Sequence, residues 1–291
     1  FRRVLFRSGF YLFITVFSII CLIPFLLVLG SSFTAERALT QNGYNIWPSE
    51  FSLDAYKLVF VSGDIPQAYL ITVGTTIVGT FFSMVFTCGA AYAMSVKNFK
   101  SRGVLALFIY FTMLFNGGLV ANYLLTTKFL HLQNNILVLL LPSFCNAWNI
   151  LLMRNFFSGI PASLAESAKI DGANDITILI KIIIPISLPG IATIGLFYAL
   201  TYWNEWYKCL LYIDSSHSQY YTLQYLIQQI LRQVNYAANQ PAEAVGLNSL
   251  TLPTYAYRMA TIIVAIGPII LLYPFLQKYF VQGLTVGSVK G

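Results

Sequence analysis

The sequence predicts an all-α polytopic membrane protein with six transmembrane helices. Apolar residues make up 57% of the 291 residues and charged residues only 9%, which is too little charge to cover the surface of a soluble domain of this size. Six long stretches carry no charged residue, and each supplies the ~20 residues that cross a bilayer core. Because these stretches are continuously apolar, they favour helices over the alternating pattern of a barrel. They are Ser8–Ala35, Ile65–Val96, Gly103–Thr127, Leu132–Met153, Ile182–Asn204 and Met259–Gln277.

The first eight residues, FRRVLFRS, match what the end of a common sequencing-library adapter would encode. We therefore expect residues 1–8 to be an artefact and residues 9–291 to form one six-span domain. The alternative is a genuine basic segment ahead of the first span. Removing Arg2, Arg3 and Arg7 lowers the net charge from +7 to about +4, which is ordinary. The charge therefore gives no sign of a nucleic-acid partner.

Lysine and arginine are unevenly distributed over the connections between the stretches. They gather after the second, fourth and sixth stretches, whereas the other connections are richer in aspartate and glutamate. Positively charged loops of membrane proteins stay in the cytoplasm. We therefore expect a multi-pass protein of the bilayer with both termini inside the cell. The basic residues concerned are Lys97, Lys100, Arg102, Arg154, Lys169, Lys181, Lys278 and Lys290.

One polar segment, residues 158–189, interrupts the apolar sequence between the fourth and fifth stretches. Pro161 suits the start of a helix over residues 162–170, because its missing N–H costs nothing there. Gly172 can adopt the positive φ that ends this helix. The charge distribution places the whole segment in the cytoplasm. We call residues 158–189 the elbow.

The second half of the elbow predicts another helix, capped by Asn174 or Asp175 and closed by Pro185. Two helices at a fixed angle can transmit force, which a flexible loop cannot. We expect Glu166 on the first helix to be exposed, ionised and unpaired within its own helix, apart from Lys169 or the turn at Ile170. It would then suit a basic residue of a docked protein, since charge-assisted contacts fix register. The alternative is an ordinary amphipathic connector, and the particular spacing of Glu, Ala, Gly, Ile and Pro favours docking.

Candidate substrate-pathway residues lie in the third and fifth stretches. Glu205 and Lys208 occur within TYWNEWYKC, where charges in a span are costly unless they are paired or face water. The aromatic rings beside them either stack on a substrate in the path or anchor the span at the membrane interface. Asn116, with two glycines after it, either breaks the third helix or permits close helix packing. The remaining candidates are Trp203, Asn204 and Trp206.

No pattern in the chain indicates catalysis, a cofactor or a metal site. The sequence contains no GxxxxGK[ST] loop for nucleotide phosphates. His131 and His217 stand alone, and a membrane-embedded enzyme would need a cluster of such residues. The four cysteines form no CxxC pair and suit apolar packing. They are Cys21, Cys88, Cys145 and Cys209.

Three segments carry a resemblance to a known family: ESAKIDGANDITILIKIIIPISLPGIATIGLFYALTYWNEWY, FNGGL, and the end YPFLQKYFVQGLTVGSVKG. They resemble the sugar-importer permeases of the ABC superfamily, in the maltose-transporter-like branch. Within that branch they are similar to oligosaccharide permeases associated with uronate-containing glycans. The chain departs from the family's cytoplasmic motif only at Ser167, where alanine is commoner. The motif residues are Glu166, Ser167, Ala168, Asp171, Gly172, Ala173 and Pro185.

This resemblance implies a type I ABC importer permease fold in a bacterial cell membrane. It implies a heterodimer with a second permease subunit, two cytoplasmic ATPase subunits and an extracytoplasmic sugar-binding protein. The elbow would sit in a cleft of an ATPase subunit, and the tail would enter the ATPase dimer interface. Alternatives are an importer of another solute and, less favoured, a secondary transporter. The tail residues are Leu284, Thr285, Gly287, Lys290 and Gly291.

Overall fold

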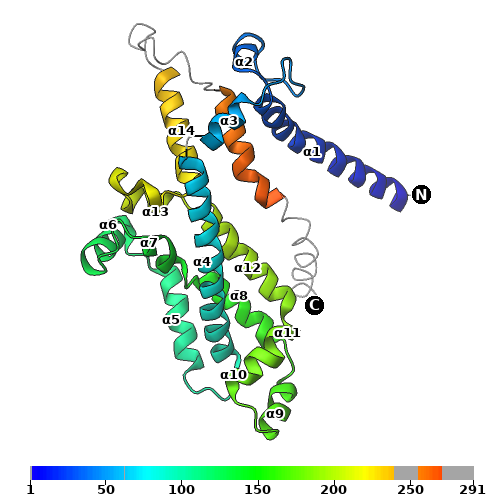
Figure 1. Cartoon of the computed structure of the whole chain (residues 1–291). Coiled ribbons are helices and arrows are strands. Elements are labelled where there is room, and N and C mark those ends of the chain that lie inside the picture. Colours follow the sequence, from blue (N-terminus) through cyan, green and yellow to red (C-terminus); the bar gives the residue numbers. More distant parts are fainter. Residues whose placement is uncertain (1, 62, 239–254, 271–291) are drawn as a thin grey trace. The chain divides into compact units, whose positions relative to one another are not determined.

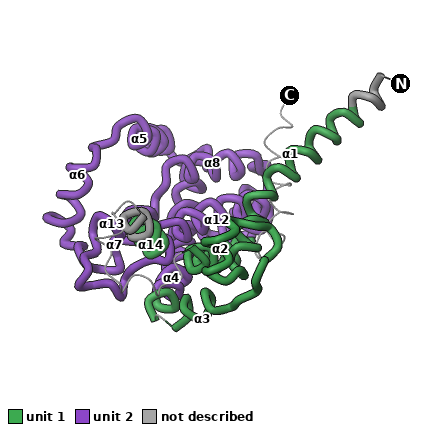
Figure 2. The backbone as a smooth tube through the Cα atoms, turned by 90° about the horizontal axis from the view of Figure 1, so that it is seen from above, with its two compact units in different colours: residues 1–67, 226–270 green, residues 68–225, 271–291 purple. Residues whose placement is uncertain are grey.

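The computed structural model describes residues 2–61, 63–238 and 255–270, and these ranges are mainly helical (Figure 1). The chain forms two compact units, residues 1–67 with 226–270 and residues 68–225 with 271–291 (Figure 2). The α-helices are α1 Arg2–Ser32, α2 Glu36–Asn42, α3 Asp54–Val61, α4 Asp64–Ser95, α5 Arg102–Leu114, α6 Gly118–Leu124, α7 Leu137–Leu140, α8 Ala147–Ser158, α9 Ala162–Ile170, α10 Asp175–Ile178, α11 Ile184–Ile186, α12 Leu188–Trp203, α13 Tyr207–Tyr212 and α14 Leu223–Ala238. A further helix covers Tyr255–Ile270. Short π- or 3₁₀-helical pieces are Leu125–Phe129, Leu141–Ser143, Leu179–Ile183 and Ser215–Tyr220.

The first unit contains an ordered segment between α1 and α3. Thr34 and Phe51 form an isolated antiparallel bridge, and the ring of Phe33 stacks on that of Phe51 at 5.8 Å. The carboxylate of Glu36 accepts hydrogen bonds from the backbone N–H groups of Tyr255 at 3.0 Å and Ala256 at 2.8 Å. A negative charge at the amino end of a helix stabilises it. This segment therefore caps the helix Tyr255–Ile270.

The predicted spans are confirmed in part. Two helices, Arg7–Ser32 and Asp64–Ser95, are long and apolar enough to cross a membrane unaided. Three further predicted spans are each a bent pair of helices, so the described residues supply up to five spans. The sixth prediction begins within Tyr255–Ile270, and its remainder lies outside the described residues. The bent pairs are Arg102–Leu114 with Gly118–Phe129 at 114°, Leu137–Ser143 with Ala147–Ser158 at 48°, and Asp175–Ile186 with Leu188–Trp203 at 90°.

The structure bends the third, fourth and fifth spans, and the break of the third at Asn116 was predicted as one alternative. The structure breaks this helix between Leu114 and Gly118. In the fourth, Pro142 lies in a 3₁₀ turn just before the bend. In the fifth, Pro189 follows the bend in the first turn of α12. Proline lacks the N–H that continues a helix, which explains bends beside these two residues.

Two tyrosines of α12 hold the core of the second unit together. Tyr198 and Tyr202 are each 1% exposed and lie one helical turn apart. The hydroxyl of Tyr202 donates to the carbonyl oxygen of Leu140 at 3.1 Å. The backbone N–H of Asn146 donates to the hydroxyl of Tyr198 at 3.2 Å. Both hydroxyls therefore satisfy backbone groups at the break between α7 and α8, which a membrane interior would otherwise leave unpaired.

We predict that Gly79→Ala destabilises the protein. A Cβ atom at Gly79 of α4 would stand 2.5 Å from the ring of Tyr202, so the buried ring must move. Overpacking of this kind costs about 1–3 kcal/mol. The measurement is the midpoint of thermal unfolding in detergent.

Gly74→Ala on the same helix is the matched control. A Cβ atom there meets nothing within 4 Å. Alanine is the better helix former by about 0.5–1 kcal/mol, so this variant should unfold at the wild-type temperature or above it. Equal midpoints for the two variants would contradict the close approach of α4 to Tyr202.

Candidate functional site

The elbow adopts the two-helix form that its sequence predicts. Its first helix, α9, covers Ala162–Ile170 and directly follows Pro161. Gly172 has φ +82°, in the left-handed region that favours glycine, and ends the helix. The side chain of Asn174 accepts from the backbone N–H of Thr177 at 2.8 Å and so caps the second helix. The prediction left the cap open between two residues, and the structure selects Asn174.

The second helix of the elbow is a continuous helical run from Asp175 to Ile186 that contains a π-helical turn, Leu179–Ile183. It ends one residue beyond Pro185, the predicted end. The chain then bends by 90° into α12. The elbow is therefore joined directly to the helix that carries Tyr198 and Tyr202.

Small side chains seat the elbow on the core of the second unit. Ala165, Ala168 and Ala173 pack against a buried cluster that includes Phe157 of α8 and Ile178 of α10. The motif residues of the opposite side are exposed to solvent. They are Glu166, Ser167, Asp171, Gly172 and Pro185. The motif thus divides into an inward alanine side and an outward polar side.

Lys169 pairs with Asp175 and not with Glu166. The distance from Lys169 Nζ to Asp175 Oδ1 is 2.9 Å, across the Gly172 turn. The hydroxyl of Tyr92, on α4, donates to the same carboxylate oxygen at 3.3 Å. Within the described ranges, the Glu166 carboxylate has no ion pair or hydrogen bond. Asp175 therefore links both elbow helices and α4, and leaves Glu166 free for another molecule.

A buried ion pair occupies a break in the helix at the far end of α12. α12 ends at Trp203 and α13 begins at Tyr207. Lys208 Nζ lies 2.5 Å from Glu205 Oε2, and the two side chains are only 15% and 11% exposed. The backbone N–H of Lys208 donates to the other carboxylate oxygen at 2.8 Å, so Glu205 also caps the start of α13.

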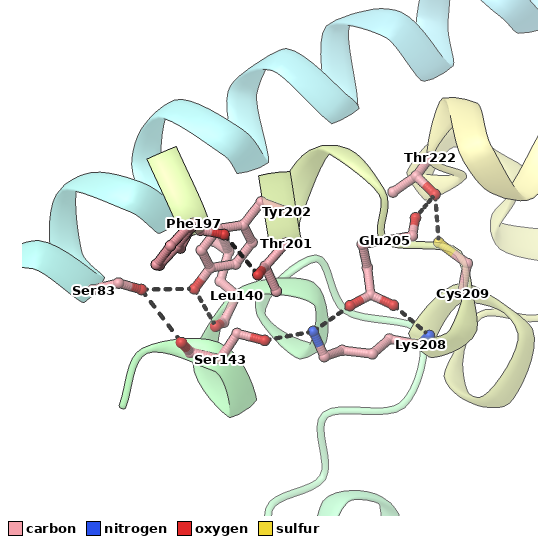
Figure 3. Close-up of polar contacts among 10 residues, drawn as sticks. All are labelled: Ser83, Leu140, Ser143, Phe197, Thr201, Tyr202, Glu205, Lys208, Cys209 and Thr222. Carbon is pink, nitrogen blue, oxygen red and sulfur yellow. Dashed lines mark hydrogen bonds and ion pairs between the residues drawn. The ribbon is translucent and has the colours of Figure 1, made fainter. Parts of the chain in front are cut away.

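Ser143 is a partner of this pair that the sequence analysis missed. Lys208 Nζ donates to Ser143 Oγ at 2.8 Å, which joins α13 to the break between α7 and α8 (Figure 3). Its only sequence signal is a hydroxyl residue next to a proline within an apolar stretch. Nothing in the order of residues indicates that Ser143 meets a residue 65 positions away.

The remaining pathway candidates make contacts of their own. Trp203 is 7% exposed, and its ring meets that of Tyr69 edge-on at 5.8 Å. Asn204 is exposed and its amide donates to the Leu200 carbonyl at 2.9 Å. Trp206 is half-buried. Asn116 is exposed and caps α6 by accepting from the N–H of Gly118 at 2.9 Å.

The predicted tail contacts lie outside the described residues, and the four cysteines form no disulfide. The tail residues are Leu284, Thr285, Gly287, Lys290 and Gly291. All four cysteines are free. Cys88 and Cys209 are buried, whereas Cys21 and Cys145 are exposed.

We predict that Lys208→Met destabilises the protein more than the double change Glu205→Gln with Lys208→Met. The single variant leaves a buried carboxylate without its cation, which costs about 3–5 kcal/mol. The double variant removes both charges, and glutamine can still accept from the N–H of residue 208. The measurements are the folded amount in membranes and the unfolding temperature in detergent. If both variants lose the same stability, the pair is not coupled.

Three comparisons place the chain among transport proteins. A family model described as "Binding-protein-dependent transport system inner membrane component" matches residues 85–286. The polygalacturonan/rhamnogalacturonan transport system permease protein YtcP of Bacillus subtilis (strain 168) is 40% identical over 290 residues, covering 100% of both chains. Protein LplC of the same organism is 37% identical over 273 residues, 94% of this chain and 90% of that protein.

A solved structure agrees with these relatives. A chain of a bacterial ABC transporter involved in the import of the acidic polysaccharide alginate has a TM-score of 0.83 and 31% identity, covering 95% of this chain and 96% of that chain. The predicted all-α type I ABC importer permease fold is thereby confirmed. The chain belongs to the family of binding-protein-dependent transport system inner membrane components.

Proposed function

We propose that this chain is one permease subunit of an ATP-driven importer of oligosaccharides, and that the elbow is its coupling site for a cytoplasmic ATPase. The observation that carries the proposal is the elbow itself. Its alanine side packs on the core while Glu166 projects from the other side without an intramolecular partner in the described part of the chain. Such an arrangement offers a fixed charge to a docked protein.

The elbow can transmit motion because its joints are fixed. Gly172 sets the turn, and the Lys169–Asp175 ion pair bridges it at 2.9 Å. An exposed ion pair alone contributes little to stability. Here the alanine packing and the Tyr92 hydroxyl act together with it, so a push on α9 is carried into α4 and α12.

The partners follow from the family and from the charge distribution. The family description names a binding protein, which we infer to be extracytoplasmic and to deliver sugar. We place the elbow and both termini in the cytoplasm because lysine and arginine gather in the connections on that side. Two ATPase subunits and a second, related permease subunit complete the assembly. ATP is hydrolysed by the ATPases, and the spans alternate between inward- and outward-facing states.

The relatives point to an acidic oligosaccharide as the cargo. The relative that is 40% identical is a polygalacturonan/rhamnogalacturonan permease, and the solved transporter imports the acidic polysaccharide alginate. We infer a uronate-containing oligosaccharide for this chain too. The same assembly would take up such a sugar in preference to a neutral oligosaccharide of equal length.

We predict that Glu166→Ala uncouples ATP hydrolysis from transport. Loss of one charge-assisted contact should weaken co-purification of the ATPase subunit, and lower uptake, by about tenfold. The fold should be unaffected, within about 0.5 kcal/mol, because Glu166 is exposed. Uptake, ATP hydrolysis and thermal unfolding are measured on the assembled complex.

Glu50→Ala is the matched control. Glu50 is also exposed, but it lies in one of the connections that are rich in aspartate and glutamate, on the side opposite to the elbow in the proposed topology. It should leave uptake and ATPase retention at the wild-type level. Wild-type uptake with Glu166→Ala would overturn the assignment of the coupling site.

We predict that proteoliposomes of the whole assembly accumulate labelled oligogalacturonate when ATP and the binding protein are present. A neutral oligosaccharide of the same length should accumulate several-fold less. Uptake of the neutral sugar at an equal rate would contradict the acidic cargo, and no uptake of either sugar would contradict import of carbohydrate.

A further inference from the structure

The break between α5 and α6 is built by two residues. Gly118 has φ +80°, in the left-handed region that favours glycine, and the Asn116 side chain accepts from its N–H at 2.9 Å. The helices on the two sides meet at 114°. Such a break leaves the last carbonyl groups of α5 and the first N–H groups of α6 without intrahelical partners, and Asn116 satisfies one of them. The break is therefore specified by the sequence.

The length of α5 sets the depth of this break in the membrane. α5 has 13 residues and begins at Arg102, shortly after Lys97 and Lys100, which we place on the cytoplasmic side. A helix of that length extends roughly 20 Å. The hydrocarbon core is about 30 Å thick, and a tilt of α5 would bring its end still closer to the cytoplasmic surface. The break therefore lies inside the hydrocarbon.

The break is uncovered in the part of the chain that the structure describes. Every residue from 110 to 122 is exposed. α5 packs on its neighbours through its first part, where Ile109 lies in a cluster with Met94 and Ile150. α6 is held near its last turn, where the ring of Tyr123 stacks on that of Tyr212 at 5.7 Å. The break stands between these two attachments, at the edge of the second unit (Figure 2).

Neither lipid nor water suits the surface around this break. Lipid offers no hydrogen bond to the free backbone groups, and irregular backbone at membrane depth occurs where protein or a water-filled path surrounds it. A water-filled path is disfavoured, because large apolar side chains are exposed on both sides of the break. They are Phe111 at 52%, Leu114 at 60%, Phe115 at 63%, Leu119 at 53% and Val120 at 71% exposure. Protein suits both the polar and the apolar part of this surface.

We propose that the second permease subunit covers the break between α5 and α6. The inference rests on the proposed function, which supplies three kinds of partner. The ATPase subunits are cytoplasmic and the binding protein is extracytoplasmic, so the second permease subunit is the partner that reaches this depth. Its apolar side chains pack on residues such as Phe115 and Val120, and its polar groups satisfy the free backbone groups of the break.

Asn116 has the chemistry of a contact across this interface. Its side-chain oxygen is engaged by the N–H of Gly118, whereas its amide nitrogen has no hydrogen-bond partner within the described ranges. That nitrogen carries two N–H donors. Asparagine side chains donate across helix pairs in membranes. We therefore expect a carbonyl or hydroxyl oxygen of the second subunit opposite Asn116.

The test is photo-crosslinking in membranes that contain the assembled transporter. Phe115 is replaced by benzoylphenylalanine, which keeps an aromatic ring at an exposed position. Irradiation should join this chain to the second permease subunit, as identified by mass spectrometry of the adduct. The adduct should be absent when the second subunit is not expressed. An adduct with lipid alone, with another part of this chain or with a second copy of this chain would overturn the inference.

A bulkier side chain provides an independent test. Lipid accommodates Val120→Trp readily, whereas a packed interface does not. Co-purification of the second permease subunit should therefore fall about tenfold, while the amount of this chain in membranes stays at the wild-type level. Val120→Ala is the matched control and should retain assembly within about twofold. Unchanged co-purification with Val120→Trp would contradict an interface at α6.

Failure of this inference can be told from failure of the proposed function. If no second permease subunit co-purifies with the wild-type chain, the proposed assembly is wrong. If the subunit co-purifies but forms no adduct at Phe115, the assembly stands and the placement of the interface is wrong.

Discussion

A membrane interior supplies no water to a backbone group that loses its helical partner, and this constraint organises the second unit. The helix Leu137–Ser143 is bent by 48° from α8, which frees backbone groups between them. Tyr198 and Tyr202 supply the hydroxyls that satisfy Asn146 and Leu140. Because both tyrosines belong to α12, the position of α8 depends on the position of α12. The elbow leaves the far end of α8, so its place depends on the same two hydroxyls.

α12 thereby connects the two polar regions of the unit. Its 16 residues extend roughly 24 Å as an α-helix. The elbow joins its first turn, the tyrosines occupy its middle and last turns, and the Glu205–Lys208 pair follows its end. A helix of this kind moves as a rigid element. A displacement imposed on the elbow by an ATPase would therefore reach the break at residues 204–206 without a flexible connection in between.

The sequence predicted what depends on neighbours along the chain. Pro161 and Gly172 act within one or two residues of themselves, so the bounds of α9 were predicted correctly. Contacts between distant positions were not predictable, because they are set by packing. Tyr92 reaches Asp175 across 83 positions, and Asp175 also pairs with Lys169 across the Gly172 turn. Hydropathy likewise reports burial in lipid and is insensitive to bends, so the 48° bend of the fourth span was not predictable.

If the chain passes a polyanionic sugar, as we propose, the pairing of Lys208 with Glu205 limits how tightly that sugar is held. A path through a membrane must bind its cargo well enough to admit it and weakly enough to release it. Free cations would hold a polyanionic sugar tightly, since charge-assisted bonds are about twice as strong as neutral ones. Lys208 is instead neutralised by Glu205 at 2.5 Å.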